Sequence, residues 1–396
     1  MNARRLVAML GLLTGLFAAG YGVMFTALDD FRDEYGISAG HLGFVVAAGF
    51  FAQFAAQVLL APRADRGQAK RLVAIGLLCN LVGLLIVAFA QQLPLLLVGR
   101  LVGGLGAGMA VPAVRRIVIL ADPAHLGSNL GLLLAADVGG FAMGPVVAAL
   151  LIGPFGIPAP FLAIAAATAA CSPVLLRVDV NEGSADVTGS SGLAFDLLRI
   201  RPFVATILYG AAVFTMIGTF DALWVLVLDD LGSSEFVSNL GITVFALPLV
   251  VFGSLGGRIA QRVGPFRVGA VGLVAGSMFM FLYGLMPTGG AMLAIGIVHS
   301  ISDSLTVSSS GVAVGMVVPA SRQAAAQGLL GGTQTLVAGV IAIVAGNVYE
   351  TFNRTAAYTT CMILMLAMVI TGIVLAGSSF GVRGEVAEPP LEPVPG

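Results

Sequence analysis

The chain has 396 residues, of which 58% are apolar and only 10% are charged. Soluble domains carry about 25% charged residues, so this chain has too few to cover a water-exposed surface, and its apolar content excludes a disordered chain. Its net charge of −1 offers no basic field for nucleic acid, and its three cysteines lie in apolar runs without metal-ligand spacing. The composition predicts a membrane protein with no metal and no cofactor.

Twelve apolar stretches are long enough to cross a bilayer as helices, which takes about 20 residues each. They cover residues 6–28, 39–60, 72–90, 93–114, 126–152, 158–176, 203–228, 237–259, 268–286, 291–318, 324–348 and 356–376. The first stretch follows two arginines as a signal peptide would, but the other stretches follow it, so we expect it to be retained. Arginines and lysines gather in alternate loops, which predicts an all-α membrane protein with both termini cytoplasmic.

The connectors are short except for residues 178–200, which form a polar segment rich in glycine and serine. This segment divides the chain into an N-terminal six-helix bundle (1–178), a cytoplasmic linker (179–201) and a C-terminal six-helix bundle (202–378). The proline-rich tail (379–396) is expected to be disordered.

Two related loops precede the third and ninth stretches. The first reads Ala61-Pro-Arg-Ala-Asp65-Arg66-Gly-Gln-Ala-Lys70-Arg71, and the second reads Gly257-Arg-Ile-Ala-Gln261-Arg262-Val-Gly264-Pro-Phe-Arg267. They lie 196 residues apart, near half the chain, which indicates two homologous halves. A carboxylate beside a helix N-terminus and opposed arginines can hold one half against the other. The alternative is that these charges only set the topology.

The first loop resembles the G-x-x-x-D-R-x-G-R/K-R/K pattern of the major facilitator superfamily at four positions, which are Asp65, Arg66, Lys70 and Arg71. Ala61 and Gln68 replace its glycines, and the second copy has Gln261 in place of the aspartate. The resemblance covers residues 1 to about 378 and implies twelve helices in two pseudo-symmetric bundles. It also implies a conformational latch, formed by Asp65 and Arg66 within a motif that includes Lys70, Arg71 and Arg262, that stabilises the outward-open state.

Two further stretches are similar to motifs of that superfamily. In the fourth stretch Arg100 is followed by Gly103 and Gly104, close to an R-x-x-x-G pattern. The fifth reads Gly140-Phe-Ala-Met-Gly144-Pro145, similar to the G-x-x-x-G-P signature of drug:proton antiporters. Small residues four apart let helix backbones approach closely, and proline distorts the local hydrogen-bond ladder. We therefore expect Gly140, Gly144 and Pro145 to form a helix-packing motif.

Ionisable groups inside apolar stretches are candidates for function, because they are costly there without a partner. The first stretch offers Arg100 no carboxylate. Asp137 lies about ten residues into the fifth stretch, near the membrane midplane and on the face of the glycine groove. A buried carboxylate beside an arginine can gain and lose a proton, so Asp137 and Arg100 are predicted to couple protons. A purely structural Arg100–Asp137 pair and a hydrated Asp137 without a role are the alternatives.

The seventh stretch contains Asp221, three residues before the single tryptophan, Trp224. At that depth a tryptophan is expected to act as an anchor at the membrane interface more often than as a binding residue. The residues that could line a substrate cavity are Tyr21, Phe25, Phe214, Asp221, Trp224 and Phe245.

The tenth stretch carries His299 and Asp303 four residues apart on one helix face, among several serines. Such a pair can titrate as a unit, so it is predicted as a second proton site or a polar substrate contact. The alternative is hydrogen bonding that holds helices together. Because no nucleophile or oxyanion pattern surrounds the pair, the sequence predicts no enzyme.

These features predict a secondary transporter of the bacterial inner membrane that exports small apolar or amphipathic compounds by alternating access, coupled to protons. Its partners would be a small-molecule substrate, protons and lipid but no nucleic acid, and a monomer is expected. The runner-up is a facilitator or proton symporter for a sugar, amino acid or organic acid. A non-transporting scaffold or sensor is a remote alternative, because the intramembrane charges and the loop motif are retained.

Overall fold

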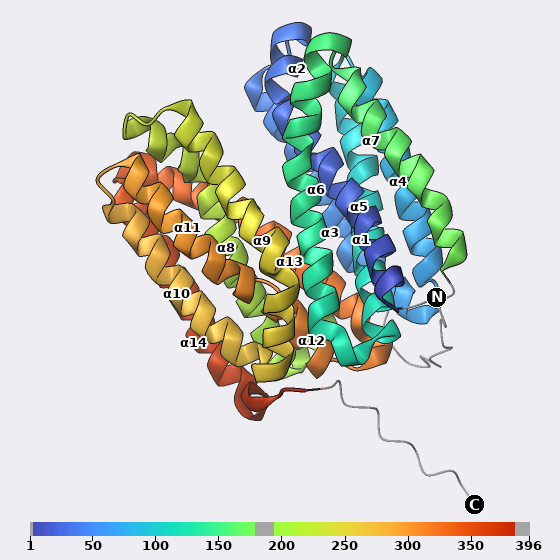
Figure 1. The fold of residues 1–396 in the computed structure, drawn as a ribbon, viewed down its shortest axis with the longest axis vertical. Helices are drawn as coiled ribbons and strands as arrows, with labels where there is room; N and C mark the ends of the chain where they lie inside the picture. Colours follow the sequence, from blue (N-terminus) through green and yellow to red (C-terminus); the bar gives the residue numbers. More distant parts are fainter. Residues whose placement is uncertain (1–2, 179–193, 385–396) are drawn as a thin grey trace, which may run out of the picture.

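The computed structural model describes residues 3–178 and 194–384, which form helices and their connections (Figure 1). Residues 179–193 of the expected linker and 385–396 of the expected tail lie outside the described residues. The α-helices of the first part are α1 (Ala3–Thr26), α2 (Leu28–Tyr35), α3 (Ala39–Leu59), α4 (Ala69–Phe89), α5 (Leu93–Ala121), α6 (Leu126–Phe155) and α7 (Pro158–Cys171). Those of the second part are α8 (Arg201–Asp230), α9 (Glu235–Val263), α10 (Pro265–Leu285), α11 (Gly289–Thr306), α12 (Ser309–Val317), α13 (Gln323–Thr351) and α14 (Arg354–Ala376).

Short 3-10 helices join or flank these helices. They are η1 (Ala61–Arg66), η2 (Pro123–His125), η3 (Ser172–Arg177), η4 (Ala194–Arg199), η5 (Ala320–Arg322) and η6 (Gly377–Gly381). The last of them runs from the end of the expected second bundle into the expected disordered tail, and just beyond it the Gly384 N–H donates to the Gln261 carbonyl at 2.9 Å. The start of the tail is therefore folded onto the end of α9.

Within the described residues, eleven helical segments are long and apolar enough to cross a membrane. Two of the expected stretches differ most from the helices of the structure. The tenth is divided, because α11 ends at Thr306 and α12 begins at Ser309. The fourth continues to Ala121 instead of ending at residue 114, so Arg115 and Arg116, which were expected in a cytoplasmic loop, lie within α5.

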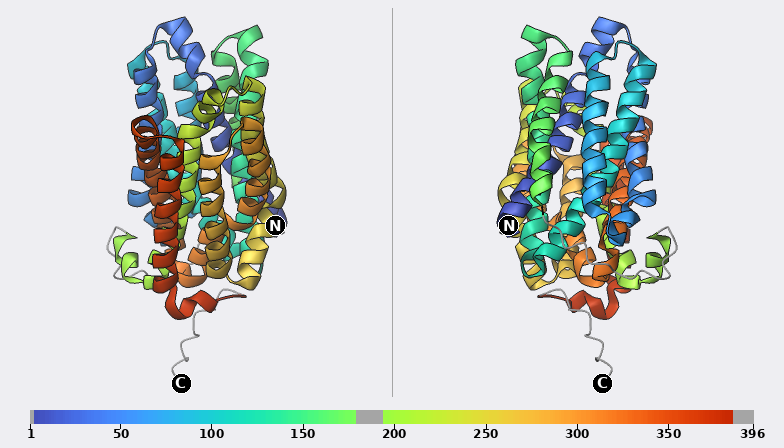
Figure 2. Two further views of the ribbon diagram at one scale, coloured as in Figure 1. Left: turned by 90° about the vertical axis from the view of Figure 1, so that its left-hand side faces the viewer. Right: turned by 90° about the vertical axis from the view of Figure 1, so that its right-hand side faces the viewer.

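Figure 1 shows α1–α7 and α8–α14 as two groups of helices that meet at the end where α12 lies and diverge toward α2. Each group has its own buried apolar cluster, one that includes Leu84 and Phe161 and one that includes Trp224 and Tyr283. The views in Figure 2 place the η6 segment at the same end as the contact between the groups. We refer to this end, where the two groups touch, as the closed end.

At the closed end the two groups are in backbone contact through glycines. Gly127 of α6 faces Gly257 of α9, and one turn further Gly131 faces Gly253, so closely that a Cβ on Gly127, Gly131 or Gly257 would overlap the opposite carbonyl. Between them the hydroxyl oxygens of Ser128 and Ser254 are 2.8 Å apart. Small residues permit such close helix contacts where lipid supplies no hydrophobic driving force between helices.

The Gly140–Gly144 motif packs α6 against α1. A Cβ on Gly140 would overlap the carbonyl of Gly15, and a Cβ on Gly144 would overlap the backbone of Gly22. Pro145 has no N–H, so the carbonyl of Phe141 four residues earlier lacks its usual donor, and this carbonyl lies directly against Gly22. The motif therefore brings two helix backbones together within the first group.

Replacing Gly140 with Ala is expected to lower the melting temperature of the purified protein, because the new methyl group meets backbone atoms that cannot rotate away. Overpacking of this kind costs about 1–3 kcal/mol. Gly153→Ala in the same helix is the matched control, since nothing lies within 4 Å of the position of its Cβ. Equal melting temperatures for the two variants in detergent would contradict this account of the packing.

Candidate functional site

Asp65 connects the two groups of helices at the closed end. Its carboxylate accepts the backbone N–H groups of Ala324 and Ala325, in the first turn of α13, at 2.9 and 2.8 Å. It also pairs with Nε of Arg116 at 2.9 Å, and both side chains are 3% exposed. The first N–H groups of a helix have no intrahelical acceptor and attract negative charge. Asp65 thus caps a helix of the opposite group, and we call this arrangement the Asp65 latch.

The other residues of the loop motif lie around the latch without forming it. Arg66 and Arg71 are exposed, and the Lys70 ammonium donates to the Val178 carbonyl at 2.7 Å. The arginine that neutralises Asp65 is Arg116 of α5, which lies outside the loop motif. A signal for it was present, because five apolar residues follow the Arg115–Arg116 pair and extend the helix beyond it.

Gln261 takes the corresponding place in the second half. Its Oε1 accepts the Gly127 N–H, in the first turn of α6, at 2.7 Å, while its Nε2 lies 3.2 Å from the carbonyl oxygens of both Pro123 and Ala124. Each half thus caps a helix of the other half, once through a carboxylate and once through an amide. Arg262, the next residue, is exposed.

Replacing Gln261 with Glu is expected to weaken the closed end, although the related loop in the first half uses an acid. A carboxylate can still accept from Gly127, but it cannot donate to the two carbonyl groups and would face them as a negative charge. Each lost buried hydrogen bond costs about 1 kcal/mol or more. Labelling of a cysteine placed at Ser254 should become faster in this variant than in its Gln261 parent. A labelling rate unchanged by Gln261→Glu would show that the amide donors are dispensable.

Asp137 of α6 points between α1 and α5, and its Oδ1 is buried without a hydrogen-bond partner. The charge that acts on it is that of Arg115, and the Thr14 hydroxyl of α1 faces it. Arginine side chains lean toward the N-terminus of their helix, which directs Arg115 up the antiparallel α5–α6 pair toward Asp137. Arg115 is thus the cationic neighbour of Asp137.

Arg100 is not close to Asp137, contrary to the expected pair. It precedes Arg115 by fifteen residues on α5, which corresponds to about 22 Å along a helix. Its guanidinium carbon lies 4.4 Å from the ring centroid of Tyr21, and the Tyr21 hydroxyl donates to Oε1 of Gln53 at 3.0 Å. The two intramembrane groups therefore belong to separate sites.

His299 and Asp303 form a buried polar row with Tyr283. Nε2 of His299 lies 3.2 Å from Oδ2 of Asp303 without a hydrogen-bonding alignment, and its Nδ1 is 3.0 Å from the Tyr283 hydroxyl of α10. Phe279 stacks on the imidazole at 4.8 Å between ring centroids. The hydroxyls of Ser300, Ser304 and Thr306 donate to carbonyls of their own helix, so these residues do not link α11 to its neighbours through these bonds.

Two groups of aromatic rings include most of the predicted cavity residues. On the first group of helices Tyr21 stacks on Phe50 at 5.7 Å, and Phe25, which is 38% exposed, contacts both Phe50 and Phe141. Neither Phe50 nor Phe141 was selected from the sequence, because a phenylalanine in an apolar helix gives no local signal of its neighbours.

On the second group of helices Trp224 packs between Phe220, Phe245 and Tyr283. Only 1% of Trp224 is exposed, so its ring is enclosed by protein instead of lying at the membrane surface, which corrects the expected interfacial anchor. Asp221, one turn earlier on α8, is exposed, and Phe214 is half-buried against the same core.

The sequence is similar to two bacterial resistance proteins. It is 28% identical to the quinolone resistance protein NorA of Staphylococcus aureus over 131 residues, which is 33% of this chain and 34% of NorA. The chain therefore matches about a third of the length of that relative. It is also 26% identical to multidrug resistance protein 2 of Bacillus subtilis over 292 residues, covering 69% of this chain and 72% of that protein.

The fold is similar to those of solved transporters. The proton:xylose symporter XylE superposes with a TM-score of 0.80 at 13% identity, and 97% of each chain is covered. The Escherichia coli fucose:proton symporter FucP gives a TM-score of 0.76 at 16% identity, covering 95% of this chain and 99% of that one. At such identities the likeness concerns the fold alone.

The family model described as Major Facilitator Superfamily matches residues 10–229 and 216–394, which together include almost the whole chain. The first match includes α1–α7 and most of α8, and the second runs from within α8 through α9–α14. The family consists of membrane transporters, and this multi-pass helical chain belongs to the Major Facilitator Superfamily.

Proposed function

We propose that the protein is a proton-coupled exporter of small apolar or amphipathic compounds that works by alternating access. The observation that carries the proposal is Asp137, a carboxylate in a membrane-length helix with one buried oxygen unpaired and the charge of Arg115 beside it. A carboxylate in such surroundings can bind and release a proton as access to it changes. The names of both resistance relatives support export as the direction.

In this proposal α9 adds a twelfth crossing to the eleven apolar segments, and both termini are cytoplasmic. The boundaries are then a six-helix bundle over residues 1–178, a linker over 179–201, a second bundle over 202–378 and a tail. The Asp65 latch and the arginine-rich loops face the cytoplasm, in accord with the excess of arginine there. The closed end is then the cytoplasmic end, and the conformation described is outward-open. The protein would act as a monomer in a bacterial inner membrane.

The two aromatic groups are the proposed walls of the substrate cavity. One group includes Tyr21 and Phe25 on the first bundle. The other includes Phe245 on the second bundle, supported from behind by the enclosed Trp224, with Phe214 and Asp221 also on α8. Apolar rings with few polar groups suit amphipathic ligands better than sugars, which need many hydrogen-bonding partners. His299 and Asp303 are proposed as a second proton site behind the second wall.

The test uses proteoliposomes that contain a pH-sensitive dye, to which cationic, neutral and anionic amphipathic compounds are added from outside. An antiporter exchanges external substrate for internal protons, so the interior should become more alkaline. A proton symporter would instead acidify the interior, and a facilitator would leave its pH unchanged. Either of these outcomes with every transported compound would overturn the proposal.

A further inference from the structure

Arg100 is a buried cation that the proposed proton chemistry does not use. Only 6% of the residue is exposed, and its Nε and Nη2 atoms have no hydrogen-bond partner within the described part of the chain. Asp137, the acid expected to neutralise it, has Arg115 as its neighbour instead. Because a guanidinium stays protonated in proteins, its charge must be balanced by something other than loss of a proton.

The protein packs closely against this guanidinium. Tyr21 covers one face at 4.4 Å, and a Cβ on Gly49 of α3 would lie 2.7 Å from Nη2. An aromatic ring attracts a cation through its face. It accepts none of the N–H bonds, because these radiate in the plane of the guanidinium. The edge of Arg100 therefore retains donors that call for a negatively charged acceptor.

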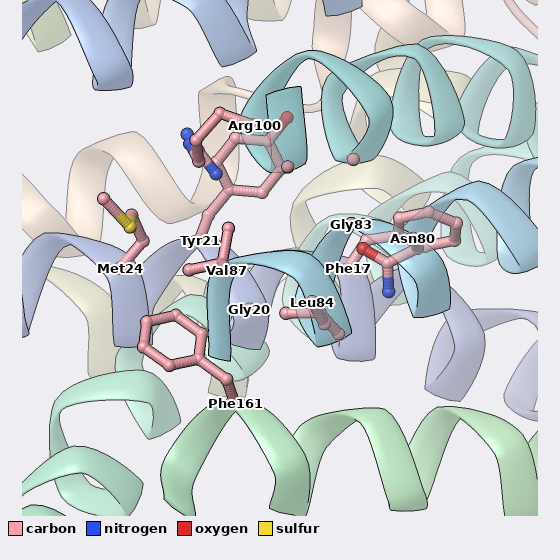
Figure 3. A pocket seen from close by; sticks show the side chains of 12 residues that line it. Phe17, Gly20, Tyr21, Met24, Asn80, Gly83, Leu84, Val87, Arg100 and Phe161 are labelled. Atoms are coloured by element: carbon pink, nitrogen blue, oxygen red, sulfur yellow. The ribbon is translucent and has the colours of Figure 1, made fainter. Parts of the chain in front are cut away.

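A small cavity adjoins this side chain inside the first bundle (Figure 3). Its volume is about 20 Å³, and its lining is otherwise apolar or glycine apart from Tyr21 and Asn80. Asn80 is 4% exposed, and its Nδ2 has no partner. The fully buried polar atoms of the lining that lack a partner are Nε and Nη2 of Arg100 and Nδ2 of Asn80, and all three are donors.

We propose that this cavity binds a small inorganic anion of the chloride class, which balances the charge of Arg100. A positive charge whose fully buried, unpaired neighbouring atoms are donors selects a negative acceptor. A volume of about 20 Å³ accepts a particle about the size of a water molecule, so a monatomic anion suits the cavity better than a whole organic anion does. The site lies within one bundle and does not depend on the direction of transport or on its coupling to protons.

Radiolabelled chloride binding to the purified full-length protein in gluconate buffer tests the proposal. We expect saturable binding of about one chloride per chain, displaced by bromide but not by the bulkier gluconate. Arg100→Gln should reduce bound chloride to background, whereas Arg100→Lys, which keeps the charge but loses the planar donors, should weaken binding at least about tenfold. Arg322→Gln, which removes an arginine outside the cavity, should bind as the wild type does.

The absence of saturable chloride binding in the wild type, or wild-type binding by Arg100→Gln, would overturn the proposal. If Arg100→Gln cannot be purified as a monodisperse protein, melting of the wild type decides. A bound anion raises the melting temperature in chloride above that in gluconate at equal ionic strength, and equal temperatures would overturn it. Because binding is measured without transport, failure of the export proposal would leave this result standing, and the reverse also holds.

Discussion

Replacing Asp65 with Asn is expected to reduce transport at least about tenfold by destabilising the closed end. The variant keeps the size of the side chain but places an amide donor where the carboxylate accepts from Ala324 and Ala325. It also leaves the buried Arg116 without its counter-charge, and breaking one partner of a buried ion pair costs about 3–5 kcal/mol. Since about 1.4 kcal/mol changes a conformational ratio tenfold, the closed state would lose most of its population. Faster labelling of a cysteine placed at Ser254, at the contact between α6 and α9, would report the opening.

Asp196→Asn is the matched control. Asp196 also pairs with an arginine across the chain, at 2.7 Å from Arg322, but 39% of its side chain is exposed. Hydrogen bonds from Arg322 hold the pKa of Asp196 below its usual range. Exposed pairs of this kind contribute only about 0–1 kcal/mol, so transport by Asp196→Asn should stay near the wild-type rate. If the two variants transported equally, the Asp65 latch would have no part in the transport cycle.

Asp137→Asn is expected to abolish accumulation against a gradient while downhill exchange of substrate continues. Asparagine fills the same space but cannot release a proton, so substrate movement would no longer be coupled to the proton gradient. Uphill transport in proteoliposomes should fall to the level of protein-free vesicles. Asp137→Glu keeps an ionisable group beside Arg115 and should retain coupled transport at a reduced rate.

Asp303→Asn provides the comparison for the second proposed proton site. Its carboxylate faces a histidine instead of an arginine, so the two acids differ in the charge that accompanies them. If Asp137→Asn accumulates substrate at the wild-type rate and Asp303→Asn does not, the coupling role passes from Asp137 to the His299–Asp303 pair. Retention of coupling in both single variants would contradict both assignments.

The sequence was sufficient for the helical content and for the Asp65 loop, because apolar length and a repeated charged motif are local signals. It was not sufficient for the partner of Asp137. Arg100 and Arg115 lie on the same helix, and the choice between them depends on the register of the α5–α6 pair, which places Arg115 within reach. Because the sequence predicts that this helix ends at residue 114, it places Arg115 and Arg116 in a loop and not among the intramembrane charges.

Rotation of each helix about its own axis was the second quantity that the sequence left open. Hydropathy places Trp224 at a depth in the membrane but does not say which neighbour its ring faces, and the ring is enclosed by Phe220, Phe245 and Tyr283. The same limit applies to Phe50 and Phe141, whose part in the aromatic groups depends on contacts between distant segments. The depth of a residue in the membrane can be predicted from its own helix, whereas the neighbour that its side chain faces depends on how at least two helices pack.

The glycine contacts between α6 and α9 close the two bundles against each other without using any of the residues proposed to bind substrate. Where Gly127 meets Gly257, the touching atoms are those of the main chain, which every amino-acid sequence shares. In the proposed transporter, substitutions in the aromatic groups would therefore alter which substrates are carried without changing the surface on which the two bundles meet. Such a transporter could change its substrate range through single substitutions, each of which leaves the contact between the two bundles unchanged.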